Sequence, residues 1–574
     1  MQTKPFLRLS IAVMLLSFLA SCHKSNKQGR LVPNDAAAVM VVDGNSLSAK
    51  LSWDDIKQNP QFQQMLLDST TPANIRSILN NPDSSGIDIK SDLMFFVEKD
   101  SAGGGYVGLE GTVKDPTLFR NFHHQIDSAG TESQVDDITF ISHYPSCIGW
   151  NKEKFVLVFD APLIGKSSGY SQRLMNDSIN PDLKRDIGAT CKSIFALDEK
   201  SSLAVNEKFT KLLKENGDIH FWINTGELYS QMFLAGPLSM LNLDNLYKDN
   251  VTTATLSFDN GKISLKSRSY MNDNMLAFYK KYVGDKINED MIQRMPGKDV
   301  DGVVAVNFKP EGIKELLKQL GVDGMANGAL SQLNLSIDDI TSAFKGDVLF
   351  GASDFNIQVD SVDGGYGGFK MPKETTNGNF VFAASIGDKD AFNKILNTAK
   401  NLIAQQSQNG NVTSNPLDLS GNNGTYFVVT NTKENTAKYL AGTNTNFDFI
   451  SNINEQPFGC YINIQSVLKG FAGVIDKDSA SQALYDASLK MWNNIYMKGG
   501  SVDGDVSTGT FEINLVDNST NSLKQLNQYI AKVSAIYKEK EAKVKAEEAQ
   551  FQKADTSAVF TPDTSVAPPV KPTN

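Results

Sequence analysis

Apolar and polar residues follow two kinds of pattern along this chain, and one combination of the two occurs twice. The paired stretches start at Val107 and at Phe380, and each opens with apolar residues at every second position, which predicts a half-buried strand. Each then changes at an aspartate, Asp115 or Asp388, to the 3.6-residue period of a helix. An aspartate at this point accepts hydrogen bonds from the free N–H groups of the first helical turn. The pattern therefore predicts one strand–cap–helix unit that is written twice, at an offset of 273 residues.

The repeat extends beyond this unit. Phe119 falls on Phe392 within the predicted helices, and the dipeptide Ile223-Asn224 falls on Ile462-Asn463 at the end of a later strand. The offset differs between the pairs, so insertions are expected in loops. The clearest is 364–378, which lengthens a hairpin that three glycines turn in the first copy.

The same patterns predict the remaining elements of each half. In the first half, strands are expected at 39–42, 92–98, 106–113, 137–159 (one or two), 218–224, 251–258 and 262–270, and helices at 60–80, from 115, within 165–215, at 226–246 and from 272. In the second half, strands are expected at 303–308, 347–352, 380–386, 426–430, 458–464 and 510–516, and helices at 311–320, from 388 and after 521. The order β-α-β-β-α-β is typical of the ferredoxin-like split βαβ unit. We therefore expect an α+β fold, duplicated, with mainly antiparallel sheets and a long C-terminal helix.

The domain organisation follows from these elements. We expect a signal peptide at 1–21, a tether at 22–30, a first half at 31–295, a second half at 296–537 and an extension at 538–574. The last helix carries an apolar stripe that should pack on the sheet of the second half, made of Leu523, Leu526, Ile530, Val533 and Tyr537. Residues 538–548 are mostly charged and predict a solvated helix, and the chain from Asp555, rich in proline, predicts a disordered tail.

The first residues are those of a secretory signal. Lys4 and Arg8 precede an apolar run from Ile11 to Ala20, which is shorter than the about 20 residues needed to cross a bilayer. The run ends in Leu-Ala-Ser-Cys, which resembles the bacterial lipobox, and this resemblance implies acylation of Cys22. Several acyl chains on one residue anchor a protein stably. The polar tether lacks the acidic run that resembles a surface-export signal, which favours the periplasmic side.

A second resemblance concerns the start of the folded body. The Val-Pro-Asn-Asp-Ala sequence at 32–36, the Asn-Ser-Leu turn at 45–47 and the Leu-Ser-Trp-Asp-Asp-Ile segment at 51–56 are similar to DUF4836 lipoproteins of Bacteroidota. The resemblance covers most of the mature chain and rests on structural motifs. It implies no activity, cofactor or active-site residue.

The composition limits the classes of partner that are expected. The 574 residues carry a formal net charge of −10, and no broad basic surface is implied, so nucleic acid is not expected as a partner. Four cysteines occur, at 22, 147, 191 and 460, without a CxxC pair, which excludes a disulfide scaffold and a cysteine-rich zinc site. Cys147 and Cys191 are interpreted as buried thiols, with a bond between them as the alternative.

The motifs that formally match catalytic or binding sites are better explained as turns, hairpins and packing positions. Residues 103–108 match GxGxxG, but they join two strands and open no helix, so a hairpin is expected rather than a dinucleotide loop. His123 and His124 are adjacent on a helix, which is poor geometry for one metal, and His143 and His220 converge with them only through tertiary structure. The segments 299–302 and 503–505 lack the ligand spacing of a calcium loop. No GxSxG, HExxH or P-loop motif occurs, so we expect no catalytic, cofactor-binding or metal-binding residue and no cofactor.

Asp-Ser pairs followed by a small or apolar residue recur along the chain. They resemble the short O-glycosylation motif of Bacteroidota periplasmic proteins, with ordinary cap chemistry as the alternative. The serines concerned are Ser69, Ser101, Ser128, Ser178, Ser361 and Ser479.

Two functions remain open. The first is a lipid-anchored, non-catalytic binding or scaffold protein of the cell envelope that faces the periplasm. Its expected partners are the outer membrane bilayer and an envelope protein or glycan. The alternative is an envelope hydrolase with its site in the cleft between the two halves. A pocket with convergent polar groups and perturbed titratable residues would favour the enzyme.

Overall fold

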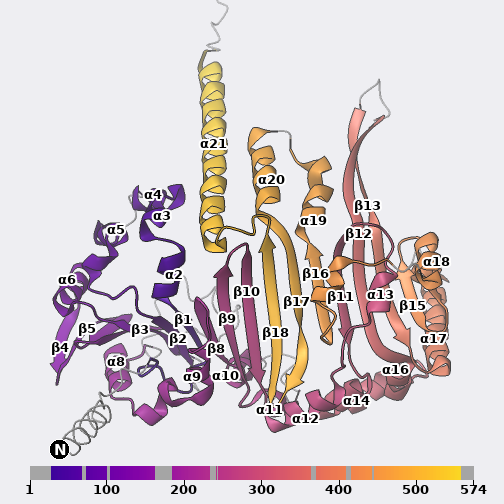
Figure 1. Cartoon of the computed structure of the whole chain (residues 1–574), viewed down its shortest axis with the longest axis horizontal. Coiled ribbons are helices and arrows are strands. Elements are labelled where there is room, and N and C mark those ends of the chain that lie inside the picture. Colours follow the sequence, from indigo (N-terminus) through magenta and orange to yellow (C-terminus); the bar gives the residue numbers. More distant parts are fainter. Residues whose placement is uncertain are drawn as a thin grey trace, which may run out of the picture.

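The described residues form one antiparallel sheet of 18 strands. The computed structural model describes residues 28–67, 73–99, 104–161, 184–232, 241, 244–363, 370–408, 415–442, 445–476 and 478–557. Figure 1 shows the strands side by side across the width of the molecule, with the first half at one end and the second half at the other. Among the described residues, no helix is both long and apolar enough to cross a membrane.

The first half contributes strands β1–β10. Its strands are β1 (Ala38–Val42), β2 (Leu93–Lys99), β3 (Gly105–Thr112), β4 (Thr131–Val135), β5 (Ile138–His143), β6 (Ser146–Trp150), β7 (Lys154–Asp160), β8 (Ile219–Asn224), β9 (Val251–Asp259) and β10 (Lys262–Tyr270). Its helices are α2 (Gly44–Lys50), α3 (Trp53–Lys57), α4 (Pro60–Leu67), α5 (Ala73–Asn80), α6 (Pro116–Ile126), α8 (Ile187–Phe195), α9 (Glu207–Leu212), α10 (Thr225–Met232), α11 (Asp244–Tyr247), α12 (Asp273–Tyr282) and α13 (Glu289–Gln293). The helix expected at 226–246 is thus described only at its two ends.

The second half contributes strands β11–β18. Its strands are β11 (Val300–Asn307), β12 (Phe344–Asp363), β13 (Lys370–Ile386), β14 (Ser420–Asn422), β15 (Tyr426–Thr430), β16 (Phe458–Asn463), β17 (Trp492–Asp503) and β18 (Val506–Leu515). Its helices are α14 (Glu311–Gln319), α15 (Asp323–Ser331), α16 (Ile337–Ala343), α17 (Lys389–Gln408), α18 (Lys433–Ala441), α19 (Ile464–Gly470), α20 (Ser479–Met491) and α21 (Ser522–Ser557).

The two halves pair their strands in the same order. In the first, the ladder runs β7–β3–β2–β1–β8–β9–β10, and in the second it runs β15–β13–β12–β11–β16–β17–β18. The halves meet where β10 and β18 pair, from Lys262 opposite Asn514 to Tyr270 opposite Val506. A continuous sheet therefore crosses the junction near which a cleft was expected.

The expected ferredoxin-like units are not confirmed. In a split βαβ unit the two strands that a helix connects are parallel to one another and are separated by another strand of the sheet. All the described pairings in the ladder are antiparallel, and β1 lies next to β2 although helices α2–α5 separate them in the chain. The order of elements was read correctly, but the hydrophobic period of a strand does not determine which neighbour it pairs with.

Successive side chains of each strand point to opposite faces of the sheet. We call face one the side of Val39, Trp222 and Thr255, and face two the side of Met40, Phe221 and Ala254. At the two ends of the sheet both faces are buried. On face one, α8 and α9 cover the first half, and α13 and α18 cover the second. On face two, α6 packs through Phe119 and α17 packs through Phe392.

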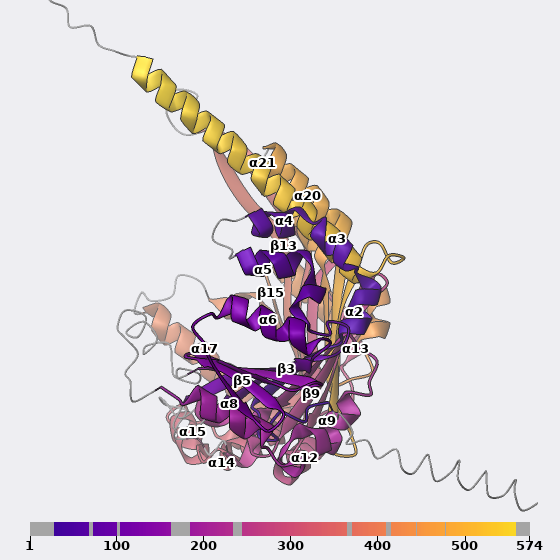
Figure 2. The same ribbon diagram turned by 90° about the vertical axis from the view of Figure 1, so that its left-hand side faces the viewer.

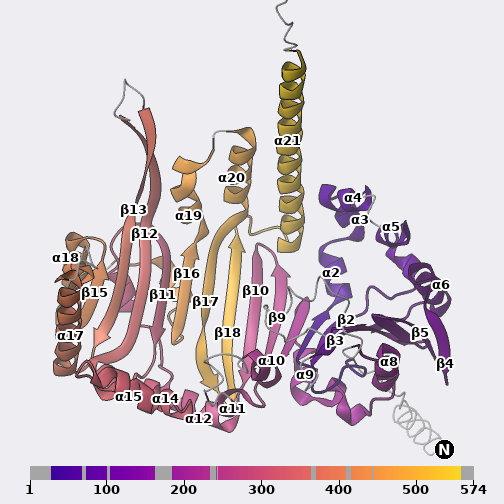
Figure 3. The ribbon, with the colours of Figure 1, turned by 180° about the vertical axis from the view of Figure 1, so that it is seen from behind.

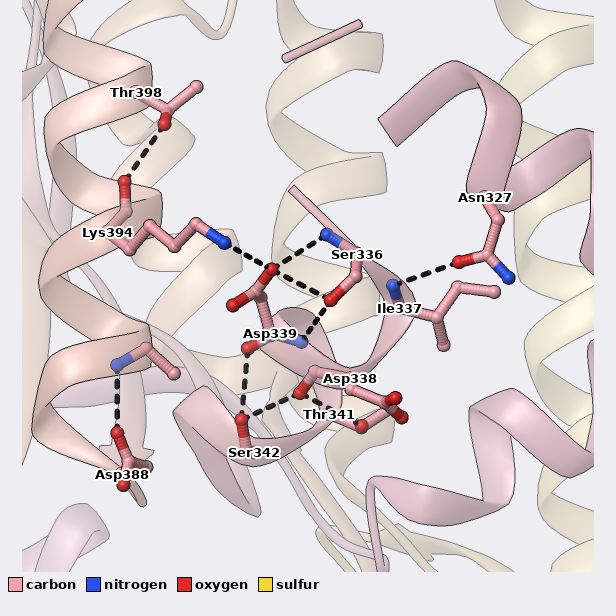
Figure 4. Close-up of polar contacts among 11 residues, drawn as sticks. Asn327, Ser336, Ile337, Asp338, Asp339, Thr341, Ser342, Asp388, Lys394 and Thr398 are labelled. Atoms are coloured by element: carbon pink, nitrogen blue, oxygen red, sulfur yellow. Dashed lines mark hydrogen bonds and ion pairs between the residues drawn. The ribbon is translucent and has the colours of Figure 1, made fainter. Parts of the chain in front are cut away.

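Helix α17 is held in place by α16. Ser336 and Asp339 form a capping box at the start of α16, and Lys394 of α17 donates to Asp339 at 2.7 Å (Figure 4). Asp388 accepts from the backbone N–H of Ala391 at 2.8 Å, which confirms the expected cap. In the first half, Asp115 accepts from Thr117 and Leu118 in the same way, at 2.8 and 3.0 Å.

Two elements project from one side of the molecule. The β12–β13 hairpin continues beyond the sheet to the pair Asp363 and Lys370, and α21 runs out beside α20 (Figures 1 and 2). Helix α21 contacts α20 and α4, and it reaches the sheet of the second half at the start of β17: Tyr529 lies on Trp492, and Asn59 donates to Asn527 at 2.7 Å. The expected apolar stripe is partly open to solvent, because Ile530 is 48% and Tyr537 is 56% exposed.

The extension after Tyr537 is helical and exposed, as expected for 538–548, and the helix continues through Asp555, where a disordered tail was expected. Residues 558–574 lie outside the described part of the chain.

Candidate functional site: a polar groove on face one

A groove of about 790 Å³ lies on face one, where the sheet has no helix over β9 and β10. Its floor is formed by alternating polar residues of these two strands, and its walls come from α2 and from the loop that precedes β8. Its described lining residues all belong to the first half. They are Asp43, Ser46, Lys50, Leu213, Lys214, Glu215, Asn216, Gly217, Thr255, Ser257, Asp259, Ser264, Lys266 and Arg268.

Asp218, which is fully buried, organises one wall of the groove. Its carboxylate accepts hydrogen bonds from Ser46 Oγ, from Lys50 Nζ and from the backbone N–H of Phe258, each at 2.6 Å. A buried carboxylate with this many donors fixes the groups around it. Asp43 caps α2 by accepting from the backbone N–H of Ser46 at 2.8 Å, so the helix presents Ser46 and Lys50 to Asp218.

The opposite wall is organised by Glu215. Its carboxylate accepts from Thr255 Oγ1 at 2.9 Å and pairs with the guanidinium of Arg268. His220 lies beneath, with Nδ1 3.4 Å from Thr255 Oγ1, and burial lowers the pKa of its imidazole. At neutral pH this histidine is therefore uncharged and serves as part of the floor.

The groove is equipped for recognition of polar groups. Asp218 and Glu215 are the carboxylates that organise the two walls. Each already accepts a hydrogen bond from a hydroxyl and pairs with a cation. Among the described lining residues, the hydroxyl that lies beside a histidine is that of Thr255, and its neighbour His220 is buried. Lys266 and Ser264 remain along the floor as donors for a ligand.

A smaller pocket of about 240 Å³ lies beside β2 and β3 on the same face. It contains Asp92, Glu110 and Lys154, and Glu110 is buried between Lys154 and the backbone N–H of Leu31. Burial, with a smaller contribution from nearby Asp43, raises the pKa of Asp92 to about 6. This is the perturbed carboxyl that an enzyme would need, and it sits in the second pocket rather than in the groove.

The histidines do not assemble into one site. His123 is buried against Phe119 and Trp150, where burial lowers its pKa to about 4. His124 pairs with Glu132 at 2.6 Å and His143 pairs with Asp127 at 2.9 Å, both at the surface. Among the described residues, no group of three His, Cys, Asp or Glu side chains is arranged to hold a metal ion.

The cysteines that the structure describes are buried thiols. Cys147 on β6 and Cys191 on α8 lie next to one another in the first core, and Cys460 is buried on β16. Cys22, the expected lipid anchor, lies outside the described residues. Gly105 and Gly108 lie on β3, which pairs antiparallel with β2 with Lys99 opposite Gly105, in agreement with the hairpin interpretation.

Three of the six Asp-Ser pairs fall on described residues. Asp127 accepts from the backbone N–H of Ala129, and Asp478 caps α20 by accepting from Ala480 and Ser481. Ser361 lies on the projecting hairpin, exposed, opposite Pro372. The pairs at 68, 100 and 177 lie outside the described residues.

A polar row in two strands is the signal in the sequence that indicates the groove. In β9 and β10 every second residue is polar on one side, at Thr253, Thr255, Ser257, Ser264 and Lys266. A hairpin in the middle of a large sheet would normally be buried on at least one face, so such a polar row marks an open face. Its partners Asp43, Glu215 and Asp218 are too far away in sequence to be associated with it by pattern.

The family model for a domain of unknown function, DUF4836, matches residues 29–434, which is more than half of the chain. The chain belongs to this family. Solved structures of TP0453 in crystal forms III and IV are similar over 46% of this chain and 90% of that chain, with 11% identity and TM-scores of 0.24 and 0.26. At these values the likeness says nothing about function. No curated protein matches the chain.

Proposed function

We propose that this DUF4836 protein is a non-catalytic binding protein of the cell envelope, anchored through acylated Cys22 in the outer membrane and facing the periplasm. The polar groove is the observation that supports a non-catalytic role. Its wall carboxylates, Asp218 and Glu215, are already bound to other side chains of the protein. What the groove offers to a ligand is a row of hydroxyl, amide and ammonium groups at fixed positions. Such a row suits a glycan or a polar segment of an envelope protein.

The anchor is tested by one substitution. Cys22→Ser should leave an unlipidated precursor or a soluble protein, because the acyl chains are attached to that thiol. Partition into a detergent phase and gel mobility measure the result. A variant that stays in the detergent phase with unchanged mobility would contradict the lipoprotein proposal.

The binding role is tested by crosslinking the protein in its own envelope and identifying what is recovered. Lys266→Glu reverses a charge on the groove floor and should abolish recovery of the specific partner. Lys433→Glu is the matched control, since Lys433 is an exposed residue of α18 far along the sheet. This variant should recover the partner fully. Equal recovery by both variants would contradict binding in the groove.

A hydrolase is the second candidate, and the raised pKa of Asp92 favours it. A carboxyl with a pKa of about 6 is half protonated near that pH, and Glu110 is a second carboxyl in the same pocket. Asp92 is therefore the candidate general acid, whereas Glu110 is held by Lys154 and by the backbone N–H of Leu31. Release of product from envelope glycans by the wild type, lost in Asp92→Asn, would favour the hydrolase over the binding protein.

A further inference from the structure

Two cysteine side chains meet in the core of the first half. Cys147 lies on β6 and Cys191 lies on α8, and both belong to the same apolar cluster. Cys147 is 1% exposed and Cys191 is 0% exposed. The two thiols hydrogen-bond to one another, so they are direct neighbours although they are far apart in the sequence.

The elements around the pair hold it in place. Helix α8 packs on β6 and β7, and Figure 3 shows it on the opposite side of these strands from α6. Cys191 Sγ lies 3.9 Å from the carbonyl oxygen of Val156 on β7, and Cys147 is the direct cross-strand partner of Val158 on the same strand. The fold therefore already brings together the helix and the strand that a disulfide would join.

Each thiol changes the acidity of the other. The hydrogen bond between them lowers the pKa of Cys147, and a hydrogen bond with Ser142 lowers it further. The same contact, together with burial, raises the pKa of Cys191. Such a pair favours one thiolate at a time, and the thiolate is the form that attacks a disulfide. Cys147 is therefore the attacking sulfur and Cys191 is the resolving one.

We propose that Cys147 and Cys191 form a structural disulfide that fastens α8 to the sheet of the first half. The oxidant is itself a disulfide, either that of a thiol oxidase or oxidised glutathione. The thiolate of Cys147 attacks one of its sulfurs, forms a mixed disulfide and expels a thiolate. Cys191 then attacks the sulfur of Cys147 and expels the second thiolate. Two electrons pass from the protein to the oxidant, and the two protein protons end on the released thiols. Because both cysteines are buried in the folded protein, the exchange takes place before α8 has packed.

The bond would stabilise the cover of the first half. It closes the loop from 147 to 191, and closing a long loop removes freedom from the unfolded chain. Cys460 stays a thiol, because it lies on β16 in the other half, where its direct cross-strand partners are Val304 and Met497. The inference rests on the proposed function in one respect, since disulfides form and persist in an oxidising compartment such as the periplasm.

The first test is independent of location. The full chain carrying Cys22→Ser keeps the cysteines at 147, 191 and 460. It is refolded in a buffer of oxidised and reduced glutathione, then unfolded in N-ethylmaleimide and weighed by mass spectrometry. It should carry one label, on Cys460, and three labels when it is reduced beforehand. Cys460→Ser is the matched control and should carry no label before reduction and two after it. A label or a glutathione adduct on Cys147 or Cys191 of the refolded chain would overturn the proposal.

The second test measures what the bond does. The oxidised chain should melt several degrees above the same chain refolded in excess dithiothreitol. The double variant Cys147→Ala and Cys191→Ala should melt at one temperature under both conditions, and the reduced wild type replaces it if it does not fold. Equal melting temperatures for the oxidised and the reduced wild type would contradict the fastening of α8.

Labelling of the chain recovered from cells separates this inference from the proposed function. One label on a chain found in the envelope supports both, because an acylated Cys22 has no free thiol. Three labels on a chain found in the envelope would overturn the disulfide but leave the anchor. A chain found in the cytoplasm would overturn the envelope location, and the refolding experiment then decides whether the two cysteines bond.

Discussion

The two halves of the molecule pair their strands in the same order, yet they extend that order in different places. The first half inserts β4–β6 between α6 and β7, and the second half lengthens the β12–β13 hairpin beyond the sheet. The elements that differ lie at the outer edge of the sheet or project from it. The strands that lie between β3 and β13 across the sheet have counterparts in both halves. The comparison teaches that the central ladder carries the fold and that the periphery accepts insertions.

The halves also place one aromatic residue alike. Phe119 on α6 lies against Trp150 and Phe155, and Phe392 on α17 lies against Phe344 and Phe427. Each is the fourth residue after its capping aspartate and donates its N–H to that aspartate's carbonyl. Both side chains are almost fully buried, so each helix is fixed to face two through the same position.

Removing either ring should have the largest effect. Phe119→Ala and Phe392→Ala should each cost about 3–5 kcal/mol in the free energy of unfolding, because each leaves a cavity under its helix. Urea denaturation measures the loss. A cost below about 1 kcal/mol in only one variant would show that the two helices are not equivalent in their packing.

The final helices of the two halves form the next comparison. Both α12 and α21 follow the last strand of their half, but α12 has 10 residues and α21 has 36. Tyr529 ties α21 to the body, with its ring 5.7 Å from Trp492 and its hydroxyl 2.9 Å from Ser488 Oγ. Tyr529→Ala should therefore cost about 2 kcal/mol, whereas Ile530→Asp, at an exposed position, should cost about 0.5 kcal/mol or less. Melting temperatures compare the two, and a larger loss in Ile530→Asp would restore the stripe expected from sequence.

The sequence predicted the local elements well. The strand–cap–helix units at Asp115 and Asp388 are both present, because caps and hydrophobic periods act over a few residues. It could not predict that β10 and β18 join the halves. Ile263 and Ile513, which lie on the last strands of the two ladders, are direct cross-strand partners.

The groove could not be predicted from the sequence either, because it too depends on which strands pair. The groove needs Asp218 beside Ser46, and this contact depends on the pairing of β1 with β8, which are far apart in the sequence. A half-buried apolar row looks the same in sequence whether a helix covers it or not. The sequence therefore predicted an alternation correctly but could not say which of the alternating faces would stay open.

A titration separates the two helices on face two. His123 of α6 falls where Leu396 lies in α17, and burial lowers the pKa of His123 to about 4. The unfolded chain takes up this proton below pH 6.5 while the folded chain does not, so stability is lost as the pH falls from 6.5 towards 4. His123→Leu should remove about 1–2 kcal/mol of that loss at pH 5 and change little at pH 8. Melting temperatures at both pH values measure it, with Leu396→His as the reciprocal variant that should acquire the acid sensitivity. Identical pH profiles for the wild type and His123→Leu would contradict the burial of a neutral imidazole.

The smallest effect is expected at the end of α21. Beyond Tyr537 its described contacts with the body are polar and exposed: Lys538 with the carbonyl of Pro60 at 3.4 Å, Lys540 with Asp478 at 3.8 Å and Lys543 with Ser479 at 2.9 Å. Exposed pairs of this kind contribute about 0–1 kcal/mol each, because water and salt screen them and the long side chains lose freedom. Truncation after Tyr537 should therefore leave the melting temperature within a few degrees. Truncation after Gln525 is the comparison, since it also removes Tyr529 and should lower the melting temperature clearly. If both truncations destabilise equally, the charged part of α21 packs on the body and the boundary drawn at Tyr537 is wrong.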